Sequence, residues 1–441
     1  MDGEVSVDFG RRAPTLRAQG GSPENRKELR WNEKGSDGSG NIGLGSLHGN
    51  RSRNSRRFAV KAMTLYLGHG WRYSLFIVRE MSHWSETAGI LSRLERLVGE
   101  GQRAALATVV RVAGSAYRRP GAKLLVETSG AALGGVSGGC LEADVREVAG
   151  LVLEGGAPIF RRYDLRGDEA VLWGLDLGCR GEVEVFVQPA TEGAFSAVAA
   201  PLAERLSQDH PLSLATVFEG REAGAMRLVA ADGTSGTLGA RELDTWADST
   251  ARRLLAEGRS TIETHGERKV FFELLQPPPH LVICGAGDDS QPLVAYAAEA
   301  GFRVTVIDHR QGLLDASRFP RAAARIEVRP ESEGAGAVLP PAERALAVVK
   351  THTLTHDREW TRRLLAAGYP YVGLLGPRAR TESILQDLGA LGDPRVYGPV
   401  GLDLGAEGAS QIAISIVAEL LALTSGREPD HLRHRREAIL G

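Results

Sequence analysis

Apolar residues follow two different spacings in the first half of the chain. From Trp84 to Val98 they return every three or four positions, which predicts a helix. Shorter apolar runs, separated by turns rich in Gly, Ser and Pro, predict strands at residues 106–112, 123–126 and 182–187. Helical spacing returns at Leu141, Val145, Val148 and Val152. This region is therefore expected to be a mixed α+β domain.

Strands and helices alternate regularly in the last third of the chain. Strands are predicted at residues 280–284, 303–307 and 347–350, and an apolar helix follows the first of them. Such alternation is typical of a doubly wound parallel sheet. The predicted fold class is α/β, with the N-terminal mixed α+β domain followed by a C-terminal Rossmann-like doubly wound parallel sheet.

Changes in this pattern mark the domain boundaries. Residues 1–80 are polar and lack periodicity, which is typical of a disordered leader. Because the patterned helix begins soon after Met81, we suspect that translation starts there. The remaining boundaries are a first domain at 81–275, a stiff proline linker at 277–279, a second domain at 280–427 and a charged tail at 428–441.

A faint internal repeat divides the first domain into residues 81–190 and 211–273. Leu106-Ala-Thr-Val109 returns as Leu214-Ala-Thr-Val217, and similar strand and turn sequences follow each copy. The shared parts are interpreted as scaffold, although chance convergence of strand sequences is the alternative. The segment 114–121 and a Ser-Gly-Gly-Cys loop occur only in the first copy, so they are better candidates for function.

Composition narrows the classes of partner and compartment. The 441 residues carry a formal net charge of −2 without a dominant basic stripe, which argues against nucleic acid as a partner. Cys140, Cys179 and Cys284 are too few and too far apart for a disulfide framework, so a reducing cytoplasm fits best. No uncharged apolar run approaches the roughly 18 residues that a membrane span needs.

The environment of Cys140 suggests a reactive thiol. This residue follows Gly138 and Gly139 and is expected in the first turn of a helix. Unpaired backbone N–H groups and the positive end of the helix dipole favour a thiolate there, which is a good nucleophile or soft metal ligand. A buried cysteine that serves as a small hydrophobic residue is an equal alternative.

Three further residues of the first copy have candidate roles near Cys140. Arg118 and Arg119 lie in a turn made rigid by Pro120 and Gly121, where they are suited to hold a phosphate or a pterin-like anion. Cys179 offers a second thiol, which pairs with Cys140 as a soft ligand or as a reversible disulfide if the fold brings the two together. A structural role for Cys179 is about equally expected.

The second domain contains the elements of a dinucleotide fold. A buried strand runs into Gly285 and Gly287, a helix follows, and a second strand ends at Asp308. The glycines permit a tight turn against a pyrophosphate at the helix N-terminus, and Asp308 would bind a ribose hydroxyl. Ser290 in place of the third glycine, and the acidic Asp288 and Asp289, oppose this. Binding of NAD or NADP is therefore an even alternative.

Other polar residues lie where later strands of this domain end. Thr351 and His352 follow a strand at the edge where doubly wound folds bind ligands. His352, His356 and Asp357 form at best a partial metal site, and capping or surface roles are favoured. Arg378 and Arg380 follow another strand and suit a phosphate clamp.

The combined motifs resemble the XdhC/CoxI family, the accessory proteins of molybdenum hydroxylases such as xanthine dehydrogenase. The resemblance covers about Trp84 to Leu423. The motifs that carry it are Gly114-Ser115, Arg119-Pro120-Gly121, Ser137-Gly138-Gly139-Cys140-Leu141-Glu142, Gly178-Cys179, Gly285-Ala286-Gly287-Asp288, Asp308-His309-Arg310, Thr351-His352, Gly373-Leu-Leu-Gly376 and Gly401-Leu-Asp403-Leu-Gly405. It implies an N-terminal CoxI-like domain and a C-terminal Rossmann domain. Arg180 departs from the common Gly-Cys-Gly-Gly motif, and the leader has no counterpart.

The resemblance implies a non-catalytic chaperone for the molybdenum cofactor. Such a protein binds molybdopterin, guards it while a cysteine desulfurase supplies a sulfur, and passes it to the apo form of a hydroxylase. Cys140 is then the thiol that contacts molybdenum, a role that suits a soft donor. The cofactor-binding residues implied are Ser137, Gly138, Gly139, Cys140, Glu142, Arg118, Arg119 and Cys179, with Gly285, Gly287, Asp308, Arg310, Thr351 and His352 in the second domain. A homodimer is the default oligomer.

Two other functions remain open from the sequence. An NAD(P)-dependent oxidoreductase is suggested by Gly285, Gly287 and Asp308, although no proton donor paired with a substrate arginine is evident near them. A redox or metal protein that uses Cys140 and Cys179 is the second alternative.

Overall fold

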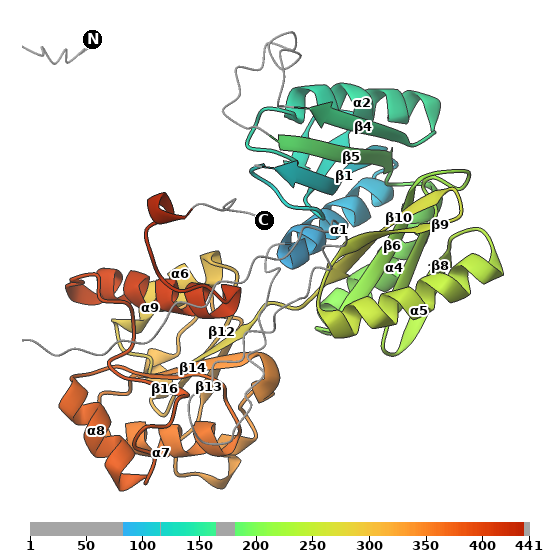
Figure 1. The fold of residues 1–441 in the computed structure, drawn as a ribbon. Coiled ribbons are helices and arrows are strands. Elements are labelled where there is room, and N and C mark those ends of the chain that lie inside the picture. The colour runs from blue at the N-terminus through green and yellow to red at the C-terminus, as the bar shows by residue number, and fades with distance from the viewer. Residues whose placement is uncertain (1–82, 115, 165–180, 436–441) are drawn as a thin grey trace, which may run out of the picture. The chain divides into compact units, whose positions relative to one another are not determined.

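The structure of the protein is a computed structural model that describes residues 83–114, 116–164 and 181–435. The predicted leader, the proposed start at Met81, Ser115, Cys179 and the end of the tail lie outside these residues. Three sheets organise the described chain: two five-stranded antiparallel sheets in the first domain and one six-stranded parallel sheet in the second (Figure 1).

In its described residues, the first half of the N-terminal domain has a leading helix and a five-stranded sheet, with a second helix between the third and fourth strands. Its strand order is β3-β2-β1-β5-β4. Helix α1 buries Trp84, Ile90 and Leu94 as its spacing predicts, but Val98 is exposed, so the apolar stripe ends earlier than expected. The elements are α1 (His83–Gly99), β1 (Ala104–Gly114), β2 (Lys123–Glu127), β3 (Ala132–Gly134), α2 (Glu142–Gly155), β4 (Ile159–Asp164) and β5 (Gly181–Pro189).

The second half has the same sequence of elements. Its strand order, β8-β7-β6-β10-β9, reproduces that of the first half. The elements are α4 (Gly193–Ser207), β6 (Leu212–Glu219), β7 (Met226–Ala230), β8 (Gly233–Thr237), α5 (Arg241–Glu257), β9 (Thr261–His265) and β10 (Arg268–Leu275). The two halves are therefore two copies of one unit, with α4 corresponding to α1 and α5 to α2.

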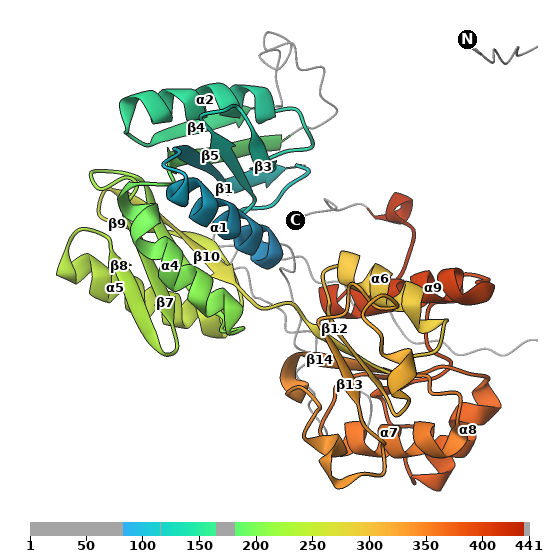
Figure 2. The same cartoon turned by 180° about the vertical axis from the view of Figure 1, so that it is seen from behind.

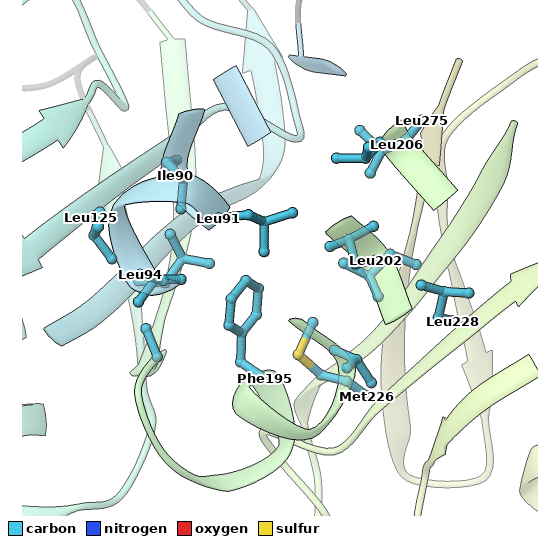
Figure 3. Packing of buried hydrophobic residues seen from close by; sticks show 14 of the residues in the cluster. Ile90, Leu91, Leu94, Leu125, Phe195, Leu202, Leu206, Met226, Leu228 and Leu275 are labelled. Carbon is cyan, nitrogen blue, oxygen red and sulfur yellow. The ribbon is translucent and has the colours of Figure 1, made fainter. Parts of the chain in front are cut away.

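The two copies share one hydrophobic core. Figure 3 shows side chains of α1 and α4 facing each other, with residues of both sheets around them. The labelled residues are Ile90, Leu91 and Leu94 of α1, Leu125 of β2, Phe195, Leu202 and Leu206 of α4, Met226 and Leu228 of β7, and Leu275 of β10. Because each copy buries its leading helix against the other, neither copy has a complete core by itself.

Two polar contacts also join the copies. The Lys123 ammonium on β2 contacts the Glu273 carboxylate on β10, and both side chains are buried. Lys123 also donates to the carbonyl oxygen of Gly121 at 2.9 Å. In the second contact, the Gln188 amide nitrogen of β5 lies 3.3 Å from the Met226 sulfur of β7.

The C-terminal domain is a parallel sheet with the strand order β13-β12-β11-β14-β15-β16. This is the order of a dinucleotide-binding Rossmann fold, in which the first three strands extend the sheet to one side of β11 and the last three extend it to the other side. The strands are β11 (His280–Cys284), β12 (Arg303–Asp308), β13 (Ala324–Glu327), β14 (Ala345–Val349), β15 (Val372–Leu374) and β16 (Val396–Tyr397). The helices are α6 (Ser290–Glu299), α7 (Leu354–Ala366), α8 (Arg378–Asp387) and α9 (Gly408–Ser425).

Helices cover both faces of this sheet. Figures 1 and 2 show α6 and α9 on one face and α7 and α8 on the other. Helix α9 is long and apolar enough to cross a bilayer, but Ile416, Val417 and Leu420 pack into the core beside α6 and the sheet. The predicted fold class, a mixed α+β domain before a Rossmann-like parallel sheet, is confirmed.

Candidate functional site

Cys140 lies in a loop, and the prediction that it occupies the first turn of α2 is wrong. The helix begins at Glu142, two residues later. Gly139 has a φ of +110°, a conformation that breaks the helix and strongly favours glycine. The Ser137 hydroxyl oxygen accepts hydrogen bonds from the N–H groups of Gly139 (3.1 Å) and Leu141 (3.0 Å). These bonds hold the loop closed and replace the missing turn of helix.

Glu142 completes this cap from the first turn of α2. Its carboxylate accepts the Ser137 N–H at 2.9 Å and the Ser137 hydroxyl. Burial of Glu142 opposes ionisation, but the hydrogen bonds from Ser137 outweigh it and lower the pKa of this carboxyl. Ser137 and Glu142 therefore fix the conformation of the loop that carries Cys140.

The Cys140 side chain is half-buried at the edge of a small hollow. It packs against the core between α2 and the first sheet, and Tyr117, Arg118 and Leu141 share the hollow with it. The Tyr117 ring covers Gly138 so closely that a Cβ atom there would lie 3.3 Å from it. The hollow has a volume of about 10 Å³, which is room for about one water molecule. A larger ligand of Cys140 must therefore lie outside the hollow, on the exposed side of the loop.

The predicted arginine turn lies beside this loop and is tied to α1. Arg118 is 28% exposed, and its Nη2 atom donates to both carboxylate oxygens of Glu86, at 2.6 and 2.7 Å. Both contacts use Nη2, so the other two guanidinium nitrogens are not committed to this carboxylate. The structure thus brings Arg118 to the same hollow as Cys140. Cys179 lies outside the described residues.

In the C-terminal domain, the glycine turn lies where the strand order reverses. Gly285 has a φ of +126°, and a Cβ atom there would lie 2.4 Å from the carbonyl oxygen of Lys350. Ser290, which replaces the third glycine, is buried. Its hydroxyl donates to the Gly285 carbonyl oxygen (2.7 Å) and accepts from Lys350 Nζ (2.8 Å). Lys350 therefore holds the two ends of the glycine turn together.

Asp289 lies directly over this turn. Its Oδ1 atom would be 2.7 Å from a Cβ atom at Gly287, and it contacts Lys350 Nζ at 2.8 Å. Its Oδ2 atom contacts His352 Nε2 at 3.1 Å. Burial opposes ionisation of Asp289, but the contact with Lys350 prevails and lowers its pKa; burial lowers the pKa of Lys350.

Asp308 occupies the expected position at the end of β12 but is already engaged. Its carboxylate accepts the Ala286 N–H at 2.7 Å, the Arg310 N–H at 2.9 Å and the Arg310 guanidinium at 2.9 Å. The residue is 3% exposed. Burial opposes ionisation, but the Arg310 side chain and these backbone groups lower the pKa of Asp308 to about 2.

The other polar residues predicted at this edge are separated into different contacts. Thr351 donates its N–H (2.9 Å) and hydroxyl (2.6 Å) to Asp357, whose second oxygen binds Arg380 at 2.6 Å. His356 instead lies 3.4 Å from Glu331. His352, His356 and Asp357 do not meet, and the described residues contain no group of three side chains arranged to bind a metal.

Several contributing residues escaped prediction from the sequence. Glu86, which binds Arg118 from a position 32 residues earlier in the chain, is marked by no local pattern. Tyr117, which packs on Gly138, lies within the segment 114–121 but was not singled out individually. Lys350 had one usable indication: a charged residue directly after the apolar run of a buried strand. Only 2% of its surface is exposed, and a buried ammonium group requires an anionic or hydrogen-bonding partner nearby.

Comparisons with known proteins agree across both domains. Residues 97–164 and 205–266 match the XdhC and CoxI family model, and residues 281–420 match the XdhC Rossmann domain model. A relative from Bacillus subtilis (strain 168), named as a probable xanthine dehydrogenase subunit, is 32% identical over 334 residues, which are 74% of this chain and 95% of the relative. A crystal structure described as a xanthine dehydrogenase from Bacillus halodurans is 29% identical with a TM-score of 0.66, and the match covers 77% of this chain and 96% of that one. The chain therefore belongs to the XdhC and CoxI family.

Proposed function

We propose that this protein is a molybdenum-cofactor chaperone for a hydroxylase of the xanthine dehydrogenase type. It binds the cofactor as cargo, keeps it accessible while a cysteine desulfurase adds a sulfur, and delivers it to the apo-hydroxylase in the cytoplasm. Membership of the family, and the xanthine dehydrogenase names of its relatives, support a role related to that enzyme.

The Cys140 loop is the observation that carries the cofactor-binding proposal. A half-buried thiol stands at the end of a loop that Ser137 and Glu142 hold in one conformation. A cargo that docks on its exposed side meets sulfur, a soft ligand that suits molybdenum. Because the loop is already shaped, little conformational entropy is lost when the cargo binds.

The arginine turn supports an anionic cargo. Arg118 shares the hollow with Cys140, and Glu86 fixes one end of its guanidinium. The remaining N–H groups can donate to the phosphate of molybdopterin, the kind of charge-assisted hydrogen bond that arginine forms well. Arg119, the next residue, adds positive charge beside it. Thiol and guanidinium together therefore match two groups of a pterin cofactor, its molybdenum and its phosphate.

Co-purification tests the proposal. The full chain is expressed in a host that makes the cofactor, and molybdenum and pterin are measured per chain. We expect wild type to retain both and Cys140→Ser to retain at least about tenfold less, which corresponds to about 1.4 kcal/mol of binding free energy. The physical reason is the replacement of a soft donor by a hard one.

Cys284 provides the matched control. It lies on β11, is fully buried, and burial raises its thiol pKa well above the usual value. Cys284→Ala should therefore keep the cofactor. Equal loss in both variants would indicate damage to the fold, and full retention by a folded Cys140→Ser protein would remove the thiol from the proposed site.

A further inference from the structure

We infer that the C-terminal Rossmann domain is closed to NAD and NADP, because the Asp289 carboxylate already occupies the position of the dinucleotide pyrophosphate. This inference concerns the second domain and does not depend on cofactor binding at Cys140. It rests on three separate contacts at the glycine turn, the third-glycine position and the end of β12.

A Rossmann fold holds a dinucleotide through three features. The pyrophosphate lies against the glycine turn at the N-terminus of the first helix, where N–H groups and the helix dipole attract negative charge. The third glycine lets this helix approach the strand closely, and an acidic residue at the end of the second strand binds the ribose. In this chain the corresponding positions are Gly287, Ser290 and Asp308.

The pyrophosphate position contains the chain's own anion. Asp289 ends the glycine turn directly before α6, and its Oδ1 atom lies over Gly287. Lys350 and His352 hold the two carboxylate oxygens at 2.8 and 3.1 Å. His352 adopts a φ of +63°, a conformation that residues other than glycine rarely adopt. A phosphate here would face the negative charge of Asp289. Lys350 and His352, which could otherwise bind the phosphate, already contact Asp289.

The residues at the third-glycine position and at the end of β12 also make contacts within the protein. The Ser290 hydroxyl is buried between the Gly285 carbonyl oxygen and Lys350 Nζ, so it ties the helix to the strand that ends at Lys350. The Asp308 carboxylate oxygens already accept hydrogen bonds from Ala286 and Arg310. A ribose hydroxyl would have to displace a backbone N–H or a bidentate guanidinium to reach it, which costs more than the new hydrogen bond returns.

Removing the charge of Asp289 should therefore open an anion site. Lys350 Nζ and His352 Nε2 would then face a position without a carboxylate. The ligand class that fits this set is a phosphate or pyrophosphate group, as carried by ADP or NAD. Asp289→Asn removes only the charge, and Asp289→Ser also removes volume above Gly287.

Calorimetric titration of the full chain with ADP and with NAD tests this inference. We expect no saturable binding to wild type, and binding of both ligands to Asp289→Asn and Asp289→Ser that is at least about tenfold tighter than any to wild type. Asp288→Asn is the matched control, because the Asp288 carboxylate is exposed and contacts Arg318 at 2.9 Å rather than Lys350 or His352, the two groups that hold Asp289. It should behave as wild type.

Two outcomes would overturn the inference. Saturable NAD binding by wild type would do so without any variant. Asp289 variants that keep the circular dichroism spectrum of wild type and still bind neither ligand would show that Asp289 is not the group that closes the site.

Discussion

The two copies of the N-terminal unit have the same scaffold but different chemistry. Both have the same strand order, and both place a glycine with positive φ against the neighbouring strand: Gly134 in the first and Gly236 in the second. Both also join a hydroxyl that precedes their second helix to a carboxylate in its first turn, Ser137 with Glu142 and Thr237 with Asp244. The duplicated parts therefore account for folding, not for a specific function.

The difference lies in one turn of helix. In the second copy α5 begins at Arg241, three residues before its capping carboxylate Asp244. In the first copy α2 begins only at its capping carboxylate, Glu142. In the first copy residues 135–141, which include Gly138, Gly139 and Cys140, separate the strand from the helix, whereas only residues 238–240 do so in the second copy. The first copy therefore has the longer loop and the shorter helix at this point.

The contacts that join the copies differ in the same way. Lys123 pairs in register with Thr108 as Met226 does with Thr216, and Gln188 pairs with Leu106 as Glu273 does with Leu214. Two equivalent contacts therefore join the copies: the ionic crossing, Lys123–Glu273, and the neutral crossing, Met226–Gln188. The ionic crossing also holds Gly121, at the end of the arginine turn.

Converting the ionic crossing into the neutral one should have the largest effect on stability. Lys123→Met or Glu273→Gln alone leaves one buried charge without its partner, and we expect each to lower the free energy of unfolding by about 3–5 kcal/mol. The double variant reproduces the Met226–Gln188 contact and should recover most of this loss. Urea denaturation of all four proteins gives the coupling energy. Additive losses would mean that Lys123 and Glu273 are not coupled, so that the ion pair does not join the copies.

Substituting the two equivalent glycines tests the shared scaffold. In Gly134→Ala the new Cβ would lie 2.3 Å from the Lys123 carbonyl oxygen, and in Gly236→Ala 2.4 Å from that of Met226. Positive φ adds strain, so we expect each variant to lose on the order of 3 kcal/mol. Thermal unfolding should show similar losses. Gly130→Ala, with positive φ but no atom within 4 Å of the new Cβ, is the control and should lose less. A large loss in one copy alone would contradict a common scaffold.

The smallest expected effect concerns the cap of the Cys140 loop and its pH dependence. Because the pKa of Glu142 is lower in the folded protein, its contribution is present above the unfolded pKa of about 4.3 and is lost as the pH falls below it. Glu142→Gln should cost about 1 kcal/mol at pH 7. The difference from wild type in urea denaturation should shrink between pH 5 and pH 3. A difference that does not change with pH would exclude ionisation of Glu142 as the cause.

Local patterns predicted most elements of this fold. The strand at 280–284 and its glycine turn were expected from an apolar run followed by Gly285 and Gly287, and β11 ends where the run ends. The helix at Cys140 was placed too early because apolar spacing continues through Leu141. The spacing cannot show that Ser137 turns its hydroxyl to the N–H groups of the loop and ends the helix at Glu142.

The sequence by itself determined the periodic elements, the alternation of strands and helices in the second domain and the presence of a thiol beside two glycines, because each depends on neighbouring residues. Only the tertiary structure decided which charges meet. Lys123 and Glu273 lie 150 residues apart in the chain, and Asp289 meets Lys350 only because β11 and β14 are adjacent in the sheet. A charge pattern does not encode such partners, since the cost of burying each charge is offset by whichever opposite group the strand order brings to it.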